Sequence, residues 1–426
     1  MEKSVYKINI IGAGISGLIA AQILENYGYY PTIIEATSSV GGRVKSDLKD
    51  GYTLDHGFQV LLTSYPAAQK YLDYNPLELQ VFLPGATIFK DGKQQTIGDP
   101  LRSFSLLFPT LLSSVGNFSD KTKILKLNTL LKKKKIAKIF KTDETSTLKY
   151  LQDFGFSDGM ITDFFKPFFS GIFLEPNLET SSRMFEFVYK MFGDGLAVLP
   201  KNGIQEIPNQ LKAKLKNTTF KFNSPVKEVK DKQIILQNGD VLNTHITIIA
   251  TEASSLISNL KKQETEWKSC DTLYFETDKR LIQKPLIGLI AEEKSLINNI
   301  FYHTSLKTST KNNKELLSVT VVKNHKLNDL DFILKVTEDL KIFCGIDVKK
   351  FLKSYQIKKA LPKLTNLQYE ISSSETKLKA TVFLAGDQLL NGSLNAAMIS
   401  GERAALGVIQ TLEDGLIVDE LTSEYS

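Results

Sequence analysis

The chain has 426 residues, of which 42% are apolar and 23% are charged, a composition typical of a soluble globular protein with two or three domains. Its net charge of +6 is modest, and its two cysteines, Cys270 and Cys344, form neither a CxxC pair nor a metal-ligand spacing. These features exclude a disulfide framework and a dithiol redox centre, and they indicate a reducing compartment, which we expect to be the cytoplasm.

The beginning of the chain has the pattern of a buried strand, a glycine-rich turn and a helix. Residues 6–11 form a short apolar run that ends at glycine, residues 15–27 have a helical pattern, and residues 31–35 have the pattern of a second strand. This order predicts a doubly wound α/β unit. The first residues do not resemble a signal peptide, and no stretch reaches the roughly 18 uninterrupted apolar residues of a membrane-spanning helix.

The turn after the first predicted strand has the glycine spacing of a dinucleotide-binding site. Gly12 permits the tight turn, Gly14 lets the backbone approach a pyrophosphate, and Gly17 allows the helix to pack closely on the strand. Glu35 closes the second strand, where an acid accepts hydrogen bonds from ribose hydroxyls and favours FAD or NAD over a 2′-phosphorylated nucleotide. The residues that we predict to bind the cofactor here are Gly12, Ala13, Gly14, Ile15, Ser16, Gly17, Glu35 and Ala36.

Two further buried strands are predicted at 245–251 and 381–386, and different kinds of sequence separate them from the first two. Residues 101–195 are rich in Phe, Leu and Lys at helical spacing, whereas residues 268–325 contain several β-rich stretches. The simplest arrangement is a nucleotide-binding domain that is interrupted twice by parts of a second domain. We predict a nucleotide-binding domain of residues 1–90, 196–265 and 362–426, and a substrate-binding domain of residues 91–195, mainly helical, and 266–361, with β-sheet.

A lysine-rich segment lies between Lys121 and Lys141, which contains nine lysines and no acid. Apolar residues at helical spacing accompany these lysines, so peripheral attachment of residues 101–141 to an anionic membrane is one interpretation. A solvated helix face is the other, and the sequence leaves both open. The aromatic residues show no stacking pattern typical of nucleic-acid binding, so no nucleic-acid partner is predicted.

Several types of site are not indicated by the sequence. The four histidines show no metal-ligand spacing, and only one dinucleotide-binding turn is present. Electrons are therefore expected to enter from an organic substrate and to leave to oxygen or a quinone. Because a dinucleotide cofactor such as FAD can accept a hydride from an apolar C–H bond without a protein acid or base, no catalytic residue is assigned. The many phenylalanines between 154 and 192 fit either an ordinary core or an aromatic substrate cavity.

Two motifs after the predicted dinucleotide turn resemble those of one enzyme family. Gly41-Gly42-Arg43 resembles the diglycine-arginine extension of the flavin amine oxidase superfamily, and residues 55–59, DHGFQ, resemble the segment whose backbone passes the flavin ring there. Residues 165–185 and 193–211 resemble the desaturase-like branch. The chain is thus similar to the FAD-dependent amine oxidase, protoporphyrinogen oxidase and phytoene desaturase superfamily.

This resemblance implies an α/β fold with a Rossmann-like FAD-binding domain of the glutathione-reductase type, a topology like that of p-hydroxybenzoate hydroxylase, and an inserted α+β substrate domain. It also implies that Asp387 hydrogen-bonds the ribityl or phosphate part of FAD, and that a helix beginning near Ser393 directs its N–H groups at the flavin. Val226 is the candidate for meeting the adenine, although strand-edge packing would produce the same residues. The further FAD contacts predicted in this way are Gly41, Gly42, Arg43, Gly57, Phe58, Gln59, Val226, Ala250, Thr251, Gly386, Asp387, Ser393, Leu394, Asn395 and Ala397.

The resemblance implies an FAD-dependent oxidoreductase that oxidises an apolar, isoprenoid-like substrate by hydride transfer to the flavin N5. Two alternatives remain, namely an amine oxidase acting on a primary amine or polyamine, and a noncatalytic prenyl-binding or lipid-binding protein of the same fold. We expect FAD to be held noncovalently, because neither Cys270 nor Cys344 lies beside a flavin-binding motif.

Overall fold

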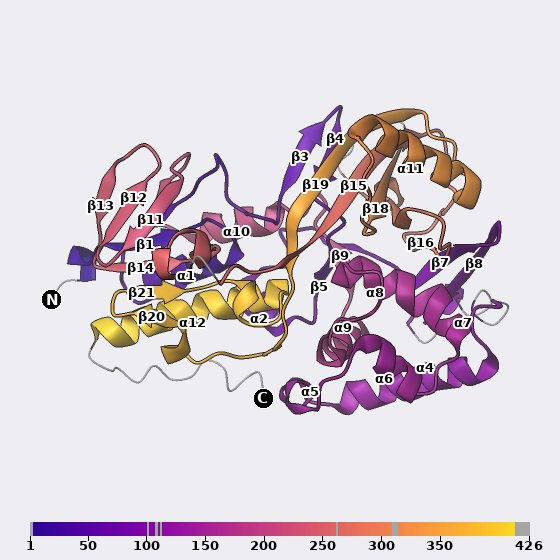
Figure 1. Ribbon diagram of the computed structural model, residues 1–426, viewed down its shortest axis with the longest axis horizontal. Coiled ribbons are helices and arrows are strands. Elements are labelled where there is room, and N and C mark those ends of the chain that lie inside the picture. Colours follow the sequence, from indigo (N-terminus) through magenta and orange to yellow (C-terminus); the bar gives the residue numbers. More distant parts are fainter. Residues whose placement is uncertain are drawn as a thin grey trace.

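The computed structural model describes residues 3–99, 102–106, 110, 113–260, 263–308 and 314–413. These residues form two lobes that lie side by side (Figure 1). One lobe contains the first strand and the last helix of the described chain, and the other contains a large sheet with a group of helices beneath it. The mixed α/β fold predicted from the sequence is confirmed.

The first lobe is built on a six-stranded sheet with the order β10-β2-β1-β14-β21-β20. All neighbouring pairs are parallel except β20 with β21. The strands predicted at 6–11, 31–35, 245–251 and 381–386 are confirmed as β1, β2, β14 and β21, and they are adjacent in the sheet. The strands are β1 (Ile8–Ile11), β2 (Thr32–Ile34), β10 (Thr219–Lys221), β14 (Ile246–Ile249), β20 (Lys377–Lys379) and β21 (Val382–Leu384).

Different layers cover the two faces of this sheet. Two long helices, α1 (Ile15–Asn26) and α12 (Leu394–Leu412), pack against each other on one face, where a Cβ atom added to Gly401 would lie 2.2 Å from the Ser16 carbonyl oxygen. A three-stranded antiparallel sheet packs on apolar residues of the other face, including Ile11, Ile34 and Ile249. Its strands are β11 (Val226–Lys230), β12 (Gln233–Leu236) and β13 (Val241–Asn243), and the lobe also contains α2 (Pro66–Tyr71) and α10 (Glu206–Lys214).

The second lobe contains a seven-stranded sheet with the order β19-β15-β18-β17-β16-β7-β8. Its longest strands, β15 and β19, run from the first lobe into the second (Figure 1). One face packs on α11 (Asp329–Cys344) through a buried apolar cluster. The strands are β7 (Gly85–Lys90), β8 (Lys93–Gly98), β15 (Trp267–Thr277), β16 (Ile287–Ile290), β17 (Ile297–Tyr302), β18 (Glu315–Val321) and β19 (Lys350–Pro362). The predicted domain boundary at residue 91 would separate β7 from the other strands of this sheet. A boundary before Gly85 would keep the whole sheet in the second domain. The division into domains stays a proposal.

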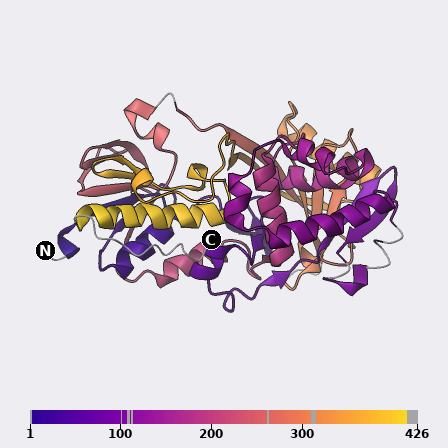
Figure 2. The same cartoon turned by 90° about the horizontal axis from the view of Figure 1, so that it is seen from below.

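Helices cover the lower side of the second lobe, and from below they form a layer in front of its sheet (Figure 2). Many of their phenylalanines form packed core, as in the contact of Phe169 with Phe185, whose ring centroids are 4.8 Å apart. This packing favours an ordinary core for the most buried of these rings. In the described ranges, no helix is both long and apolar enough to cross a membrane. The helices are α4 (Phe118–Lys133), α5 (Ile136–Lys141), α6 (Thr147–Asp153), α7 (Asp158–Met160), α8 (Lys166–Phe173) and α9 (Ser182–Asp194).

Short antiparallel strands lie at the junction of the two lobes. The hairpin of β3 (Ser46–Lys49) and β4 (Tyr52–Asp55) leads directly into the DHGFQ segment. A second small sheet has the order β5-β9-β6, with β5 (Leu61–Leu62), β6 (Gln80–Val81) and β9 (Ala197–Leu199).

Candidate cofactor and active site

The glycine turn of residues 12–17 has the geometry that its sequence predicts. Gly12 has a φ of +104°, and its N–H donates to the Ile34 carbonyl oxygen at 2.9 Å. A Cβ atom on Gly12 would lie 3.0 Å from the Ala250 carbonyl oxygen, and one on Gly17 would lie 2.0 Å from the Gly12 carbonyl oxygen. Any larger residue at Gly12 or Gly17 would therefore push α1 away from the carboxyl ends of β1 and β14.

Gly14 differs from Gly12 and Gly17 because there is free space where its side chain would be. Among the described residues, no heavy atom lies within 4 Å of a Cβ atom placed there, and no side chain caps the start of α1 at Gly14. The Gly41 N–H donates to the Ala13 carbonyl oxygen at 2.9 Å, which brings Gly42 beside Gly14. Two glycine segments thus border a space at a helix N-terminus, the arrangement that fits a pyrophosphate.

Glu35 lies directly behind this turn and is buried. Its carboxylate accepts hydrogen bonds of 2.8 Å from the Ala13 N–H, the Thr37 N–H and the Thr37 hydroxyl. A carboxylate offers about four acceptor positions, so one remains for a ribose hydroxyl. The Ser224 N–H donates to the Glu35 carbonyl oxygen at 2.9 Å, which places the start of β11, at Val226, beside Glu35.

Arg43 and Asp387 are 344 residues apart in the sequence but form an ion pair. The Asp387 side chain is only 5% exposed, whereas that of Arg43 is 40% exposed and reaches inward from the surface. Gly386 has a φ of +150°, and its N–H donates to the Ser400 hydroxyl of α12 at 2.9 Å. The two predicted cofactor motifs at opposite ends of the sequence therefore lie side by side in the fold, and each contributes a charged side chain there.

The start of α12 is held by its own side chains. The Ser393 hydroxyl accepts from the Ala396 N–H at 3.0 Å, and the Asn395 side-chain oxygen accepts from the Ala67 N–H at 2.9 Å. These side chains have structural partners, so an interaction with FAD would come from the N–H groups and the positive end of the helix, including those of Leu394 and Ala397. Similarly, Ile15 is part of the core and the Ser16 hydroxyl lies 3.5 Å from that of Ser400, which leaves their backbone N–H groups for the cofactor.

The segment of residues 57–59 lies between the two lobes. Gly57 has a φ of +93°, and the Gln59 side-chain amide donates to the carbonyl oxygens of Arg43 and His56, each at 2.8 Å. The Phe58 ring is turned toward the second lobe, with its centroid 5.3 Å from that of Phe301. This segment is therefore tied to the phosphate end of the site through Arg43 and to the second lobe through Phe58. Of the other predicted residues, Ala250 is half-buried, and Ala36 and Thr251 are exposed; all three directly follow the carboxyl ends of β2 and β14.

Asp55 is the first residue of the DHGFQ segment, and it has a structural role that the sequence did not reveal. Burial raises the pKa of its carboxyl to about 6, and this carboxyl accepts from the Ser46 hydroxyl at 2.5 Å and the Ile204 N–H at 3.1 Å. The Asp55 carbonyl oxygen accepts from the Tyr274 hydroxyl of β15 at 2.9 Å. Asp55 therefore fixes the start of the 57–59 segment against both lobes.

We expect the variant Asp55→Asn to change how stability depends on pH. The ordinary aspartate pKa is 3.8 and the folded value is about 6, so between these values the folded protein binds more protons than the unfolded chain. Stability contributed by Asp55 therefore falls as the pH rises through this window, by up to about 3 kcal/mol. Relative to the wild type, Asp55→Asn should gain stability from pH 4 to 7 in urea unfolding. A constant difference across this range would contradict the buried, protonatable carboxyl.

The face of the seven-stranded sheet that is turned away from α11 meets Phe58 through Phe301 and meets Asp55 through Tyr274. In the register of the sheet, Thr272 lies opposite Thr320, which lies opposite Asn299, while the alternate residues point toward α11. His303 belongs to this face, since its Nε2 lies 3.0 Å from the Ser318 hydroxyl and its ring lies 6.4 Å from that of Phe58. Burial lowers the pKa of His303 to about 4, so its imidazole is neutral at physiological pH. Two-residue alternation in β15 and β18 was the available sequence signal for this face, whereas a register shift breaks it in β17.

The described ranges contain no group of three or more His, Cys, Asp or Glu side chains placed to hold a metal ion. Cys270 and Cys344 are free, buried thiols, and burial raises the pKa of each to about 12.

Comparison with known proteins agrees with this geometry. The model of the family described as flavin containing amine oxidoreductase matches residues 15–409. The chain belongs to the flavin containing amine oxidoreductase family. Its cofactor is accordingly FAD, and the glycine-lined space beside Gly14, the remaining acceptor position of Glu35 and the Arg43 guanidinium fit that group.

Two curated relatives resemble short parts of this family member. An L-amino-acid oxidase from Sistrurus catenatus edwardsii is 37% identical over 76 residues, 18% of this chain and 15% of the relative. A 4,4'-diapophytoene desaturase from Staphylococcus aureus (strain Newman) is 43% identical over 56 residues, 13% of this chain and 11% of the relative. The matched segments thus span a small fraction of both relatives.

Solved structures share the fold over nearly the whole chain. An oxidoreductase from Methanosarcina mazei has a TM-score of 0.73 at 17% identity, covering 95% of this chain and 100% of that chain. Putrescine oxidase bound to putrescine has a TM-score of 0.66 at 16% identity, covering 95% of this chain and 99% of the other. At these identities, the similarity concerns the fold.

Proposed function

We propose that this FAD-dependent oxidoreductase oxidises an apolar, isoprenoid-like substrate at a C–H bond, and that oxygen or a quinone then takes up the electrons. The observation that supports this substrate class is the group of neutral rings packed around Phe58. The rings that meet Phe58 belong to Phe82, Phe301 and the uncharged His303. A protonated amine would lose its hydration there without gaining a charged partner among these rings, whereas an apolar chain would be stabilised.

The chain's own residues bind and orient the reactants in this proposal. When bound, FAD supplies the acceptor for a hydride from the substrate, and this hydride carries both of the electrons that are transferred. The 57–59 segment forms the boundary between cofactor and substrate, and the positive end of α12 stabilises negative charge on the reduced cofactor. Both thiols are buried and protonated, which supports noncovalent binding of FAD.

An amine oxidase is the second candidate, and the 37% identity of one segment to an L-amino-acid oxidase favours it. The segment shared with a diapophytoene desaturase, 43% identical, favours the first. A noncatalytic prenyl-binding protein is the third, and it has no evident need for the paired Arg43 and Asp387 beside a glycine-lined phosphate site.

Anaerobic reduction of the bound flavin distinguishes the three candidates. We expect the purified protein with FAD to lose its visible flavin absorbance when carotenoid precursors are added, and to keep it when polyamines or aromatic amines are added. Porphyrinogens serve as a second class of C–H donor that carries no amine. Bleaching by amines alone would reverse the order of the first two candidates, and a protein that cannot be reconstituted with FAD would support the third.

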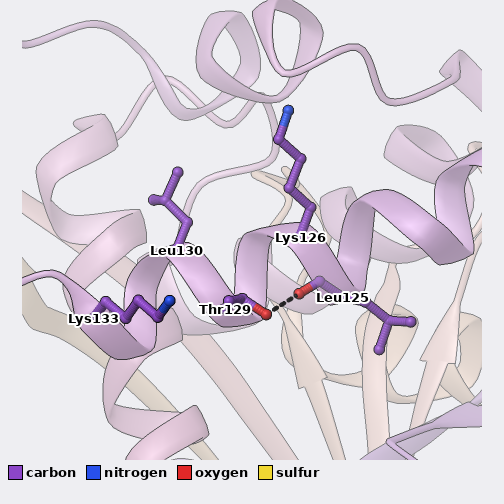
Figure 3. Close-up of a pocket in the computed structure, with 5 residues that line it drawn as sticks. All are labelled: Leu125, Lys126, Thr129, Leu130 and Lys133. Atoms are coloured by element: carbon purple, nitrogen blue, oxygen red, sulfur yellow. Dashed lines mark hydrogen bonds between the residues drawn. The ribbon is translucent and has the colours of Figure 1, made fainter.

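We further infer that the protein acts in the cytoplasm and attaches to an anionic membrane surface through α4. Phe118, Leu125 and Leu130 on this helix are 81%, 49% and 41% exposed, and its lysines include Lys126 and Lys133. Figure 3 shows Leu125 and Leu130 beside these two lysines around a surface hollow. The only acid of α4, Asp120, is buried in the N-terminal cap, so the exposed face combines apolar, cationic and uncharged polar groups and carries no acid.

Sedimentation with anionic liposomes at low salt tests this attachment. We expect the wild type to sediment and the double variant Leu125→Ser/Leu130→Ser to lose at least about tenfold in binding, since each leucine contributes part of its burial energy in the membrane. The matched control is Leu330→Ser/Leu334→Ser, which removes two leucines of similar exposure from the acid-containing helix α11. Equal binding of both double variants, or no binding of the wild type, would contradict the inference.

A further inference from the structure

Trp267, the only tryptophan of the chain, lies beside the cofactor site at the first residue of β15. The Arg43 guanidinium carbon lies over its indole ring, 5.2 Å from the centroid. We propose that Trp267 is a positioning residue of the FAD site that holds Arg43 toward the anionic diphosphate of the cofactor. The proposal rests on the family's cofactor and not on the identity of the substrate.

Three separate elements contact the Arg43 guanidinium. It pairs with Asp387, its Nη1 donates to the Ala360 carbonyl oxygen of β19 at 3.2 Å, and its central carbon lies over the Trp267 ring. A guanidinium has five N–H donors in a rigid plane. Of these, two are directed at Asp387 and Ala360 within the described residues, so the remaining donors can serve a phosphate while the ring holds the plane.

Trp267 itself is fixed from two sides. Its strand pairs with β19 at Pro362, and its indole N–H donates to the Glu252 carboxylate at 3.4 Å. Lys359 pairs with the same carboxylate, and its ammonium lies 6.0 Å from the indole centroid. Burial raises the pKa of Glu252, but the hydrogen bonds from Lys359 and Trp267 outweigh it and hold that pKa below its usual range. Glu252 is therefore ionised and keeps the indole oriented.

This support matters because an arginine side chain is long and flexible. Without a neighbouring surface, Arg43 would lose rotamer freedom when it binds a phosphate, and that loss would weaken the binding of FAD. A cation over an indole face is attracted by the ring, most strongly for tryptophan among the aromatic residues. Because β15 and β19 run between the lobes, the same contact ties the cofactor site to the strands that carry the second lobe.

A double-mutant cycle measures whether Trp267 acts through Arg43. FAD is titrated into the apoprotein of the full chain, without substrate, and binding is followed by the fluorescence of the flavin. We expect Trp267→Leu to weaken FAD binding by about 3-fold to 30-fold, the range of a cation–π contact. In an Arg43→Met background the same change should weaken binding by less than about 2-fold, because the partner cation is gone. Trp267→Phe, which keeps a ring, should restore most of the affinity.

The control is Phe154→Leu, which removes the ring beneath another lysine, Lys126, in the helical part of the second lobe. It should leave FAD affinity unchanged. Thermal unfolding of each apoprotein checks that the variant is folded. If Trp267→Leu is unstable, Glu252→Ala takes its place in the cycle, because Glu252→Ala removes the acceptor of the indole N–H. Equal losses in both Arg43 backgrounds, or wild-type affinity of Trp267→Leu, would overturn the proposal. Both measurements are made without substrate, so a failure of this proposal would not contradict the proposed reaction.

Discussion

The variant Gly14→Ala should bind FAD about 10-fold to 100-fold more weakly than the wild type while its apoprotein remains as stable. Gly14 has φ −72° and ψ 179°, a conformation that alanine adopts readily, and an added methyl group meets no described atom within 4 Å. The fold therefore has no reason to change. The methyl group would instead occupy the space at the start of α1 where the pyrophosphate approaches, and overpacking of this kind costs about 1–3 kcal/mol.

Titration with FAD and urea unfolding of the apoprotein together check this expectation. Gly193→Ala is a matched control, because Gly193 is exposed near the end of α9 and a methyl group there also meets no described atom. It should leave FAD binding unchanged. Wild-type affinity of Gly14→Ala would show that the phosphates do not pass this glycine, and a large loss of apoprotein stability would show that the site is less open than the structure indicates.

The second large effect is expected for Gly401→Ala, which should lower the free energy of unfolding by about 3 kcal/mol or more. A methyl group on Gly401 would lie 2.2 Å from the carbonyl oxygen of Ser16 and 3.0 Å from its Cα atom. These are backbone atoms of α1, so no flexible side chain can move aside and the two helices must separate. Because both helices begin at the cofactor site, FAD affinity should fall together with stability.

Urea unfolding of the apoprotein measures the first effect and FAD titration the second. Gly193→Ala again provides the control, since it makes the same chemical change at an exposed position of a helix. An unchanged urea midpoint of unfolding for Gly401→Ala would mean that α1 and α12 are less closely packed than the structure shows. In that case no loss of FAD affinity would be expected.

The glycine geometry of the proposed cofactor site could be predicted because its motifs are local. The turn at Gly12 and Gly17 needs residues without side chains, and the paired glycines at 41 and 42 need close approach, so these requirements are visible in the sequence. The existence of strands β1, β2, β14 and β21 could be predicted from their apolar runs, whereas their order in the sheet is known only from the structure. The placement of β7 could not be predicted, since its partner β16 lies far along the chain.

What could not be predicted are properties that arise from burial and from contacts between distant residues. The raised pKa of Asp55 and the neutrality of His303 depend on the residues packed around them. The contact of Trp267 with Arg43 depends on how β15 and β19 leave the first lobe. Sequence alone left the role of the phenylalanines between 154 and 192 open, and the structure places the most buried of them in a core.

The sequence by itself determined the dinucleotide turn, the acid at position 35 and the type of fold, because glycine conformations and strand patterns are encoded in neighbouring residues. Only the tertiary structure decided that Asp387 pairs with Arg43, that Trp267 covers the same guanidinium, and that neutral rings surround Phe58. The physical reason is that a side chain's charge, exposure and partners are set by whatever the fold brings next to it, which for Arg43 and Asp387 lies 344 residues away along the chain.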